Sequence, residues 1–133
     1  TIIAAPGSSN YFKGGIVSYT NEVKENLLHV DHATLEEFTA VSEPVAKQMV
    51  IGACNALNVD YAIACTGVAG PGGGTPQNPV GTIWIAYGSK DDIRTIKLTE
   101  DEGRDMNIST ATCTALRAFL EYYKEKNPQP VEE

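Results

Sequence analysis

Two kinds of hydrophobic pattern follow one another along the chain. After Ser42, which can cap a helix, apolar residues recur at every fourth position from Val45 to Leu57. This spacing predicts an amphipathic helix, and a similar spacing over residues 104–126 predicts a second one. A shorter helix is expected after Thr20 or Asn21, either of which can cap it. Capping residues and spacing together therefore predict three helices.

Short apolar runs predict the strands. They occupy residues 16–19, 61–65, 81–87 and 93–98, and the last two are expected to pair as a hairpin. The run at 61–65 carries no charge, which favours a strand buried on both faces. The order of strand, helix, helix, strands and helix predicts a single three-layer α/β/α domain with a mixed sheet.

The chain length supports one domain. With 133 residues, of which 42% are hydrophobic, the chain can enclose one core but not two. Residues 1–126 are expected to form the domain and residues 127–133, rich in Pro and Glu, a flexible acidic tail. The chain begins with Thr1 and resembles the tail of a helix, so we expect its N-terminal part to be missing.

A glycine-rich stretch follows the run at 61–65. Residues 66–76 contain five glycines and two prolines, which allow close approach of a ligand to the backbone and limit its freedom. The stretch fits neither a Walker A loop nor a dinucleotide fingerprint. At the carboxyl end of a buried strand it predicts a ligand-binding loop, although a simple connection between strands is the alternative.

Charge and cysteine content narrow the class of function. A formal net charge of -7 argues against nucleic acid and against anionic membranes as partners, while an anionic small molecule stays possible. Three unpaired cysteines indicate neither a disulfide framework nor a zinc site, so a reducing cytoplasm is expected. All three are predicted to be buried and inert, with Cys65, directly before the glycine loop, as an alternative nucleophile.

A metal site is the weakest of the chemical hypotheses. His29, Asp31 and His32 lie close together in the sequence and invite a metal-dependent hydrolase as one reading. A third well-placed ligand is not evident, and metal sites need a specific ligand number and geometry. The sequence therefore predicts no metal and no cofactor.

Three stretches together resemble one protein family. They are the Pro-Gly-Ser-Ser turn and the following residues up to Lys24, then residues 40–46, and then the glycine loop with its continuation to Trp84. In this order they are similar to the carboxyl-terminal domain of the competence/damage-inducible CinA proteins, also found alone as bacterial nicotinamide-nucleotide amidase. The resemblance implies hydrolysis of nicotinamide mononucleotide to nicotinic acid mononucleotide and ammonia.

The resemblance also implies roles for individual residues. Lys24 would be the general base, Tyr19 would relay a proton or orient that lysine, and Thr66 would contact the nucleophile or the oxyanion, a serine-lysine variant of the catalytic triad. The family's nucleophilic serine lies in a Glu-Ser-Cys-Thr-Gly-Gly segment upstream of this chain's first residue. No serine in these 133 residues matches that motif.

Binding of the substrate is expected to use the backbone. Gly67 and its neighbours can donate N–H groups to the reacting oxygen. The phosphate can be held by either of two sets of donors, and the sequence does not choose between them. These sets are Ser8 with Ser9, and Gly72, Gly73, Gly74 with Thr75.

Two further expectations concern the class of protein and its assembly. Without an upstream nucleophile, the chain would be a non-catalytic nucleotide-binding or assembly domain of the same fold. A homo-oligomer is also expected, because a small domain with several aromatic residues in its later elements can expose much apolar area. The aromatic residues in question are Trp84, Tyr87, Tyr122 and Tyr123.

Overall fold

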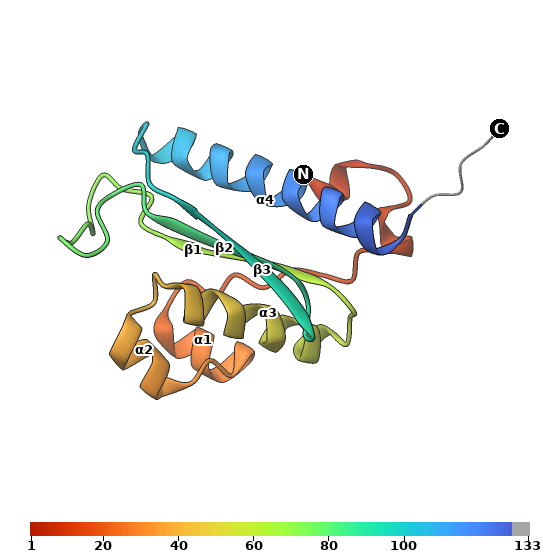
Figure 1. Ribbon diagram of the computed structural model, residues 1–133, viewed down its shortest axis with the longest axis horizontal. Helices are drawn as coiled ribbons and strands as arrows, with labels where there is room; N and C mark the ends of the chain where they lie inside the picture. The colour runs from red at the N-terminus through yellow and green to blue at the C-terminus, as the bar shows by residue number, and fades with distance from the viewer. Residues whose placement is uncertain (129–133) are drawn as a thin grey trace.

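The computed structural model describes residues 1–128, whose helices and strands form three layers (Figure 1). The elements in chain order are η1 (Ile2–Ala4), η2 (Ser8–Asn10), α1 (Asn21–Leu28), α2 (His32–Phe38), α3 (Glu43–Leu57), β1 (Ala62–Gly67), β2 (Ile83–Ser89), β3 (Asp92–Leu98) and α4 (Arg104–Lys126). Helix α4 covers one face of the sheet and α3 the other, with α1 and α2 beside α3. The three-layer α/β class is thus confirmed. The predicted acidic tail lies mostly outside the described residues.

The described strands form an antiparallel sheet rather than a mixed one. Their order is β1-β2-β3, with Ala62 opposite Gly88 and Ile85 opposite Ile96. The predicted strand at 16–19 is wrong, because these residues join no ladder. A cavity lined by both this segment and β1 separates the two. With no neighbour to pair with, the segment has no hydrogen bonds that would make it a strand.

The helix ends follow local chemistry. The Thr20 hydroxyl accepts a hydrogen bond from the Val23 N–H at 3.3 Å, and so caps α1 as predicted. Ser42 lies at the N-cap position of α3, but its hydroxyl donates to the Thr39 carbonyl at 2.9 Å instead of capping the helix. The helix still begins where the sequence predicts it.

The core has one part on each face of the sheet. Between the sheet and α3 it includes the fully enclosed Val45 and Val50, and between the sheet and α4 it includes Ile85 and Tyr122. Burial on both faces was expected for β1 and is wrong, because Ala64 and Thr66 on one face are buried while Cys65 and Gly67 on the other are exposed. Its Cys65 is exposed, as is Cys113, and only Cys54 of the three cysteines is buried.

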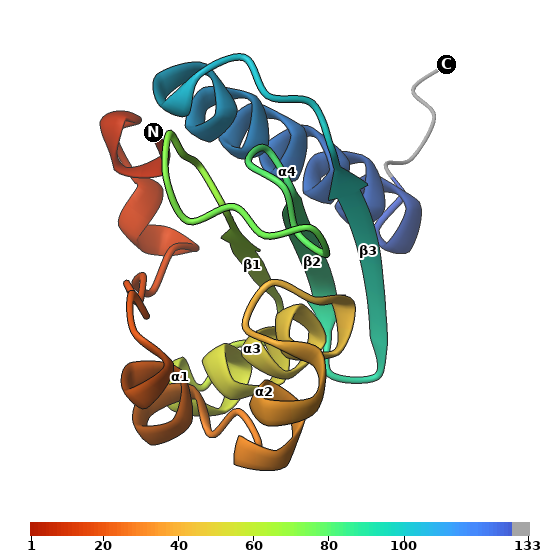
Figure 2. The ribbon, with the colours of Figure 1, turned by 90° about the vertical axis from the view of Figure 1, so that its left-hand side faces the viewer.

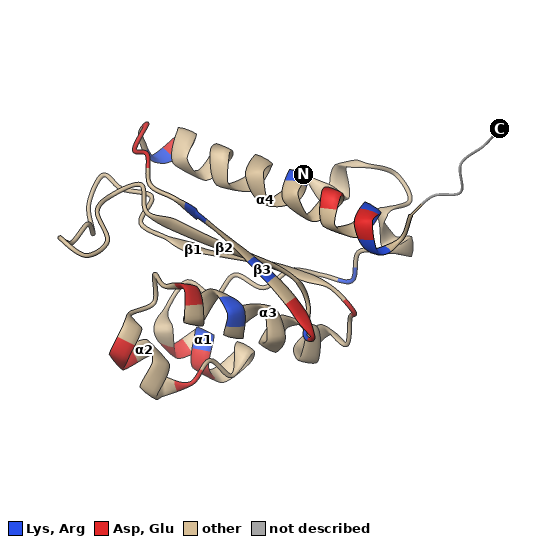
Figure 3. Ribbon diagram, in the orientation of Figure 1, with Lys and Arg blue, Asp and Glu red and all other residues tan. Residues whose placement is uncertain are grey.

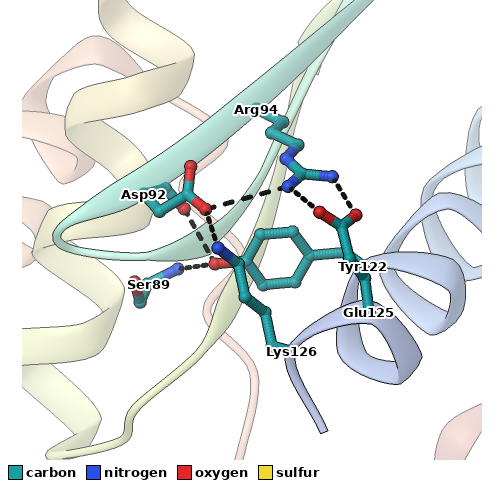
Figure 4. Close-up of polar contacts among 6 residues, drawn as sticks. All are labelled: Ser89, Asp92, Arg94, Tyr122, Glu125 and Lys126. Carbon is teal, nitrogen blue, oxygen red and sulfur yellow. Dashed lines mark hydrogen bonds and ion pairs between the residues drawn. The ribbon is translucent and has the colours of Figure 1, made fainter. Parts of the chain in front are cut away.

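The C-terminal end of α4 is fastened to the hairpin of β2 and β3 (Figure 4). The Tyr122 hydroxyl accepts from the Ser89 N–H at 3.3 Å and donates to the Asp92 carbonyl at 3.0 Å. Around it, Arg94 binds Glu125 through two hydrogen bonds of 2.8 and 2.9 Å. These contacts fix the position of α4 across the sheet.

Candidate active site

A cavity of about 1320 Å³ lies beside the unpaired edge of β1. Its walls come from residues 11–19, from β1 and from one side of α4. Figure 2 shows these segments, which are far apart in the sequence, around the same region of the molecule. A mostly apolar lining with a few polar groups is typical of small-molecule sites. The cavity therefore defines where the predicted catalytic residues should be sought.

Lys24 is buried at this cavity. It belongs to the first turn of α1, is only 7% exposed, and its Nζ donates to the Ser18 carbonyl at 2.7 Å. Burial lowers the pKa of Lys24 below its ordinary value, because desolvation disfavours the charged form. An amine that loses its proton more readily can act as a general base.

Thr66 and Gly67 reach the same cavity from the end of β1. The Thr66 hydroxyl is buried and donates to the Ala40 carbonyl at 2.7 Å, which leaves its lone pairs available as acceptors. At Gly67, a Cβ atom would lie 2.6 Å from the Ile83 side chain, so only glycine fits there. Strand pairing thus sets the position of both residues.

Tyr19 completes the group of predicted catalytic residues at the cavity. It lines the cavity together with Lys24, Thr66 and Gly67, but it is 80% exposed. The ring is therefore largely open to solvent at the edge of the cavity. All three predicted catalytic side chains therefore line the same cavity.

The residues predicted to bind phosphate lie elsewhere. Ser8 is buried in η2, where its N–H already donates to the Ala5 carbonyl at 3.3 Å, and Ser9 is exposed. Residues 72–75 are exposed as well, with Thr75 and Asn78 closing a turn through two hydrogen bonds. Neither set lines the cavity.

Two residues of α4 hold the glycine loop, although no sequence pattern marks either of them. Arg104 donates from Nη1 to the Gly70 carbonyl at 2.9 Å, and Asn107 donates from Nδ2 to the Ala69 carbonyl at 3.0 Å. The loop itself carries no charged residue (Figure 3). In the sequence, Asn107 is one polar residue at the start of an amphipathic helix, and nothing there distinguishes it from a surface position.

Cys65, the alternative nucleophile, also lines the cavity. Its surface is accessible to solvent in the cavity, yet the surrounding walls desolvate the thiol and raise its pKa. A raised pKa reduces the fraction of thiolate, which is the nucleophilic form. Burial thus argues against Cys65 as the nucleophile.

The two histidines are used in local contacts. His29 ends α1 in the left-handed conformation, and the His32 ring contacts the Glu25 and Glu36 carboxylates. Within residues 1–128, no three side chains of the metal-binding types His, Cys, Asp and Glu gather in one place. The same residues contain no helix with both the length and the apolar character needed to cross a membrane.

Comparison with known protein sequences gives consistent results. The sequence profile of the family described as "CinA C-terminal domain" matches residues 1–123. A CinA-like protein of Sulfurihydrogenibium sp. (strain YO3AOP1) is 49% identical over 122 residues, which cover 90% of this chain and 30% of that protein. A CinA-like protein of Mycobacterium marinum (strain ATCC BAA-535 / M) is 59% identical over 121 residues, or 87% of this chain and 28% of that protein. The chain thus spans less than a third of the length of these curated relatives.

Solved structures with the same fold cover most of this chain. The competence damage-inducible protein A of Klebsiella pneumoniae subsp. pneumoniae MGH 78578 superposes with a TM-score of 0.88 at 30% identity, over 96% of this chain and 78% of that one. A competence-damaged protein (CinA) superfamily protein of Escherichia coli gives a TM-score of 0.87 at 32% identity, over 91% and 70% of the two chains.

Proposed function

This chain belongs to the CinA C-terminal domain family, and we propose that it is an amidohydrolase domain acting on nicotinamide mononucleotide. The products would be nicotinic acid mononucleotide and ammonia. The observation that carries the proposal is the buried Lys24, whose pKa is lowered by burial and which lines one cavity with Tyr19 and Thr66. This set of groups suits amide hydrolysis through a serine.

Lys24 would act as the general base. In its neutral form it accepts the proton of a serine hydroxyl while the serine oxygen attacks the carboxamide carbon. The carbonyl oxygen takes the displaced electron pair and becomes an oxyanion. When the C–N bond breaks, the lysine returns its proton to the departing ammonia, and water then hydrolyses the acyl-enzyme. The serine would come from a segment upstream of Thr1, as the family resemblance implies.

Thr66 and Tyr19 would support this base. Thr66 donates its proton to the Ala40 carbonyl, so its oxygen can accept a hydrogen bond from the attacking hydroxyl or from Lys24. Tyr19 can swing its hydroxyl toward Lys24 and relay a proton. Binding of the phosphate by Ser8 and Ser9, or by residues 72–75, stays a prediction, since these residues lie outside the cavity lining.

The test is ammonia release from nicotinamide mononucleotide by the full-length protein. Lys24→Ala and Lys24→Arg are expected to lower kcat by about 100-fold or more, because removing a general base typically costs that much. Arginine keeps the charge and the donor but does not deprotonate. Lys124→Ala, on the exposed face of α4, serves as the control for loss of a lysine.

The outcomes separate this proposal from its main alternative. No ammonia release by the wild-type full-length protein would overturn the amidase proposal. If that protein nevertheless binds nicotinamide mononucleotide in calorimetry, the domain is a nucleotide-binding module that keeps the fold without the reaction. Equal activity of the wild type and Lys24→Ala would remove Lys24 from the mechanism.

A further inference from the structure

Asn107 is a buried amide that connects three segments of the chain. Its Nδ2 donates to the Ala69 carbonyl at 3.0 Å and to Asp101 Oδ1 at 2.9 Å, while its Oδ1 accepts from the Glu102 N–H at 2.8 Å. The residue is only 4% exposed. Because both its donor and acceptor groups are engaged, the amide is held in one orientation.

Asp101 helps to hold the Asn107 amide in this orientation by accepting a hydrogen bond from one of its two N–H groups. Hydrogen bonds from the Asn107 side chain and from the Gly103 N–H lower the pKa of Asp101. The carboxylate therefore stays an acceptor for Asn107. The amide nitrogen of Asn107 is left with its other hydrogen directed at the Ala69 carbonyl.

The contact with Ala69 determines where the next N–H group of the loop points. In a trans peptide the N–H points opposite to the C=O of the same plane. Since the Ala69 carbonyl faces Asn107, the Gly70 N–H points away from α4. In the same way, the Val68 carbonyl accepts from the Gly81 N–H at 2.8 Å, which turns the Ala69 N–H away from Gly81.

These two N–H groups have no acceptor within residues 1–128. Neither the Ala69 nor the Gly70 N–H donates to a backbone or side-chain acceptor in this part of the chain. Ala69 lines the same cavity as Lys24 and Thr66. Successive N–H groups without partners form a binding place for a negatively charged oxygen, and the uncharged loop offers no competing carboxylate.

We propose that Asn107 is a positioning residue that aims the Ala69 and Gly70 N–H groups at the oxyanion formed from the substrate carboxamide. This inference rests on the proposed amidase function. The loop lies at the same end of the molecule as the first turns of α4 (Figure 1), so a side chain of this helix can orient it. Asn107 itself does not touch the substrate.

The test compares kcat and KM of the full-length wild type with those of Asn107→Leu and Asn107→Asp. Both variants lose the donor to the Ala69 carbonyl, and Asn107→Asp keeps the acceptor for the Glu102 N–H. Because removing one oxyanion donor outright costs about 100-fold or more in kcat, misdirecting a donor should cost about tenfold or more. KM should change by less than about twofold, since the oxyanion exists only in the transition state.

Tyr122→Phe is the matched control. It also removes two buried hydrogen bonds made by α4, but at the far end from the loop. It is expected to lower Tm and to leave kcat unchanged. If Asn107→Leu does not fold, Asp101→Asn probes the same contact, because it removes the charge that orients the Asn107 amide, and a smaller fall in kcat is expected.

Each contrary result has a distinct meaning. Wild-type kcat in a folded Asn107 variant with lowered Tm would show a purely structural role and overturn this inference alone. A raised KM with unchanged kcat would mean that the loop binds a ground-state group such as the phosphate, which also overturns it. No ammonia release by the wild type would overturn the inference together with the proposed function.

Discussion

Lys24 combines deep burial with a single hydrogen bond. Its Nζ donates to the Ser18 carbonyl, a contact that a neutral amine makes as well as an ammonium group. Burial lowers the pKa of the group, so folding disfavours the protonated form relative to the unfolded chain. At this one residue the protein gives up some stability to hold a base in its neutral form.

The lowered pKa of Lys24 should make the stability of the protein depend on pH in the alkaline range. The folded pKa of Lys24 lies below the unfolded value, so the unfolded state binds more protons between the two. Up to the unfolded pKa of about 10.4, the difference in free energy of unfolding between the wild type and Lys24→Met should therefore rise with pH. The total rise is about 1.4 kcal/mol for each pH unit that separates the folded from the unfolded pKa of Lys24. Urea unfolding of both proteins over this pH range measures it. A flat or falling difference would contradict the lowered pKa.

At the scale of elements, the crossing of α1 and α3 depends on one glycine. A Cβ atom at Gly52 would lie 1.9 Å from the Leu28 carbonyl oxygen at the end of α1. Such a contact is between backbones, so no side chain can move aside to relieve it. The close approach places α1, and with it Lys24, against α3 and next to the cavity.

Gly52→Ala is therefore expected to destabilise the fold although alanine favours helices. Overpacking costs about 1–3 kcal/mol or more, against a propensity gain of about 1 kcal/mol, so the free energy of unfolding should fall by about 1 kcal/mol or more. Urea denaturation measures this change. Ser109→Ala, on the exposed face of α4, is the control for a helix substitution without a clash. Stabilisation by Gly52→Ala would show that α1 and α3 separate easily.

At the scale of the whole molecule, association depends on what the surface exposes. Of the aromatic residues expected to favour an oligomer, Tyr87 and Tyr122 are buried within the chain, and Tyr123 is half exposed. Exposed apolar side chains on α4 include Met106, Ile108 and Leu120, of which the last two also line the cavity. These residues are the basis on which a homo-oligomer is still proposed.

Light scattering coupled to size exclusion tests the proposed association. The wild type should elute with a mass of at least two chains, because burying the apolar side chains of α4 removes them from water. Met106→Glu, at an exposed position outside the cavity lining, should shift the protein toward the monomer, whereas Ser109→Ala should not. A monomeric wild type at all concentrations tested would contradict the proposal.

Local patterns in the sequence were sufficient for most elements. Helical spacing located α3 and α4, the cap Thr20 located α1, and the paired runs located the hairpin of β2 and β3. The grouping of Lys24, Tyr19 and Thr66 at one cavity agrees with the family resemblance rather than with any local pattern. Periodicity and capping act over a few residues, and a single sequence displays them directly.

Only the tertiary structure decided the features that depend on distant neighbours. Residues 16–19 are strand-like in composition, yet a strand needs a partner, and here a cavity lies beside β1. Cys65 has the composition of a core position but faces that cavity. Asn107 acquires its role from Ala69, 38 positions away in the chain. Strand pairing, burial and hydrogen bonding between separate elements depend on residues far apart in the chain, so local sequence patterns do not reveal them.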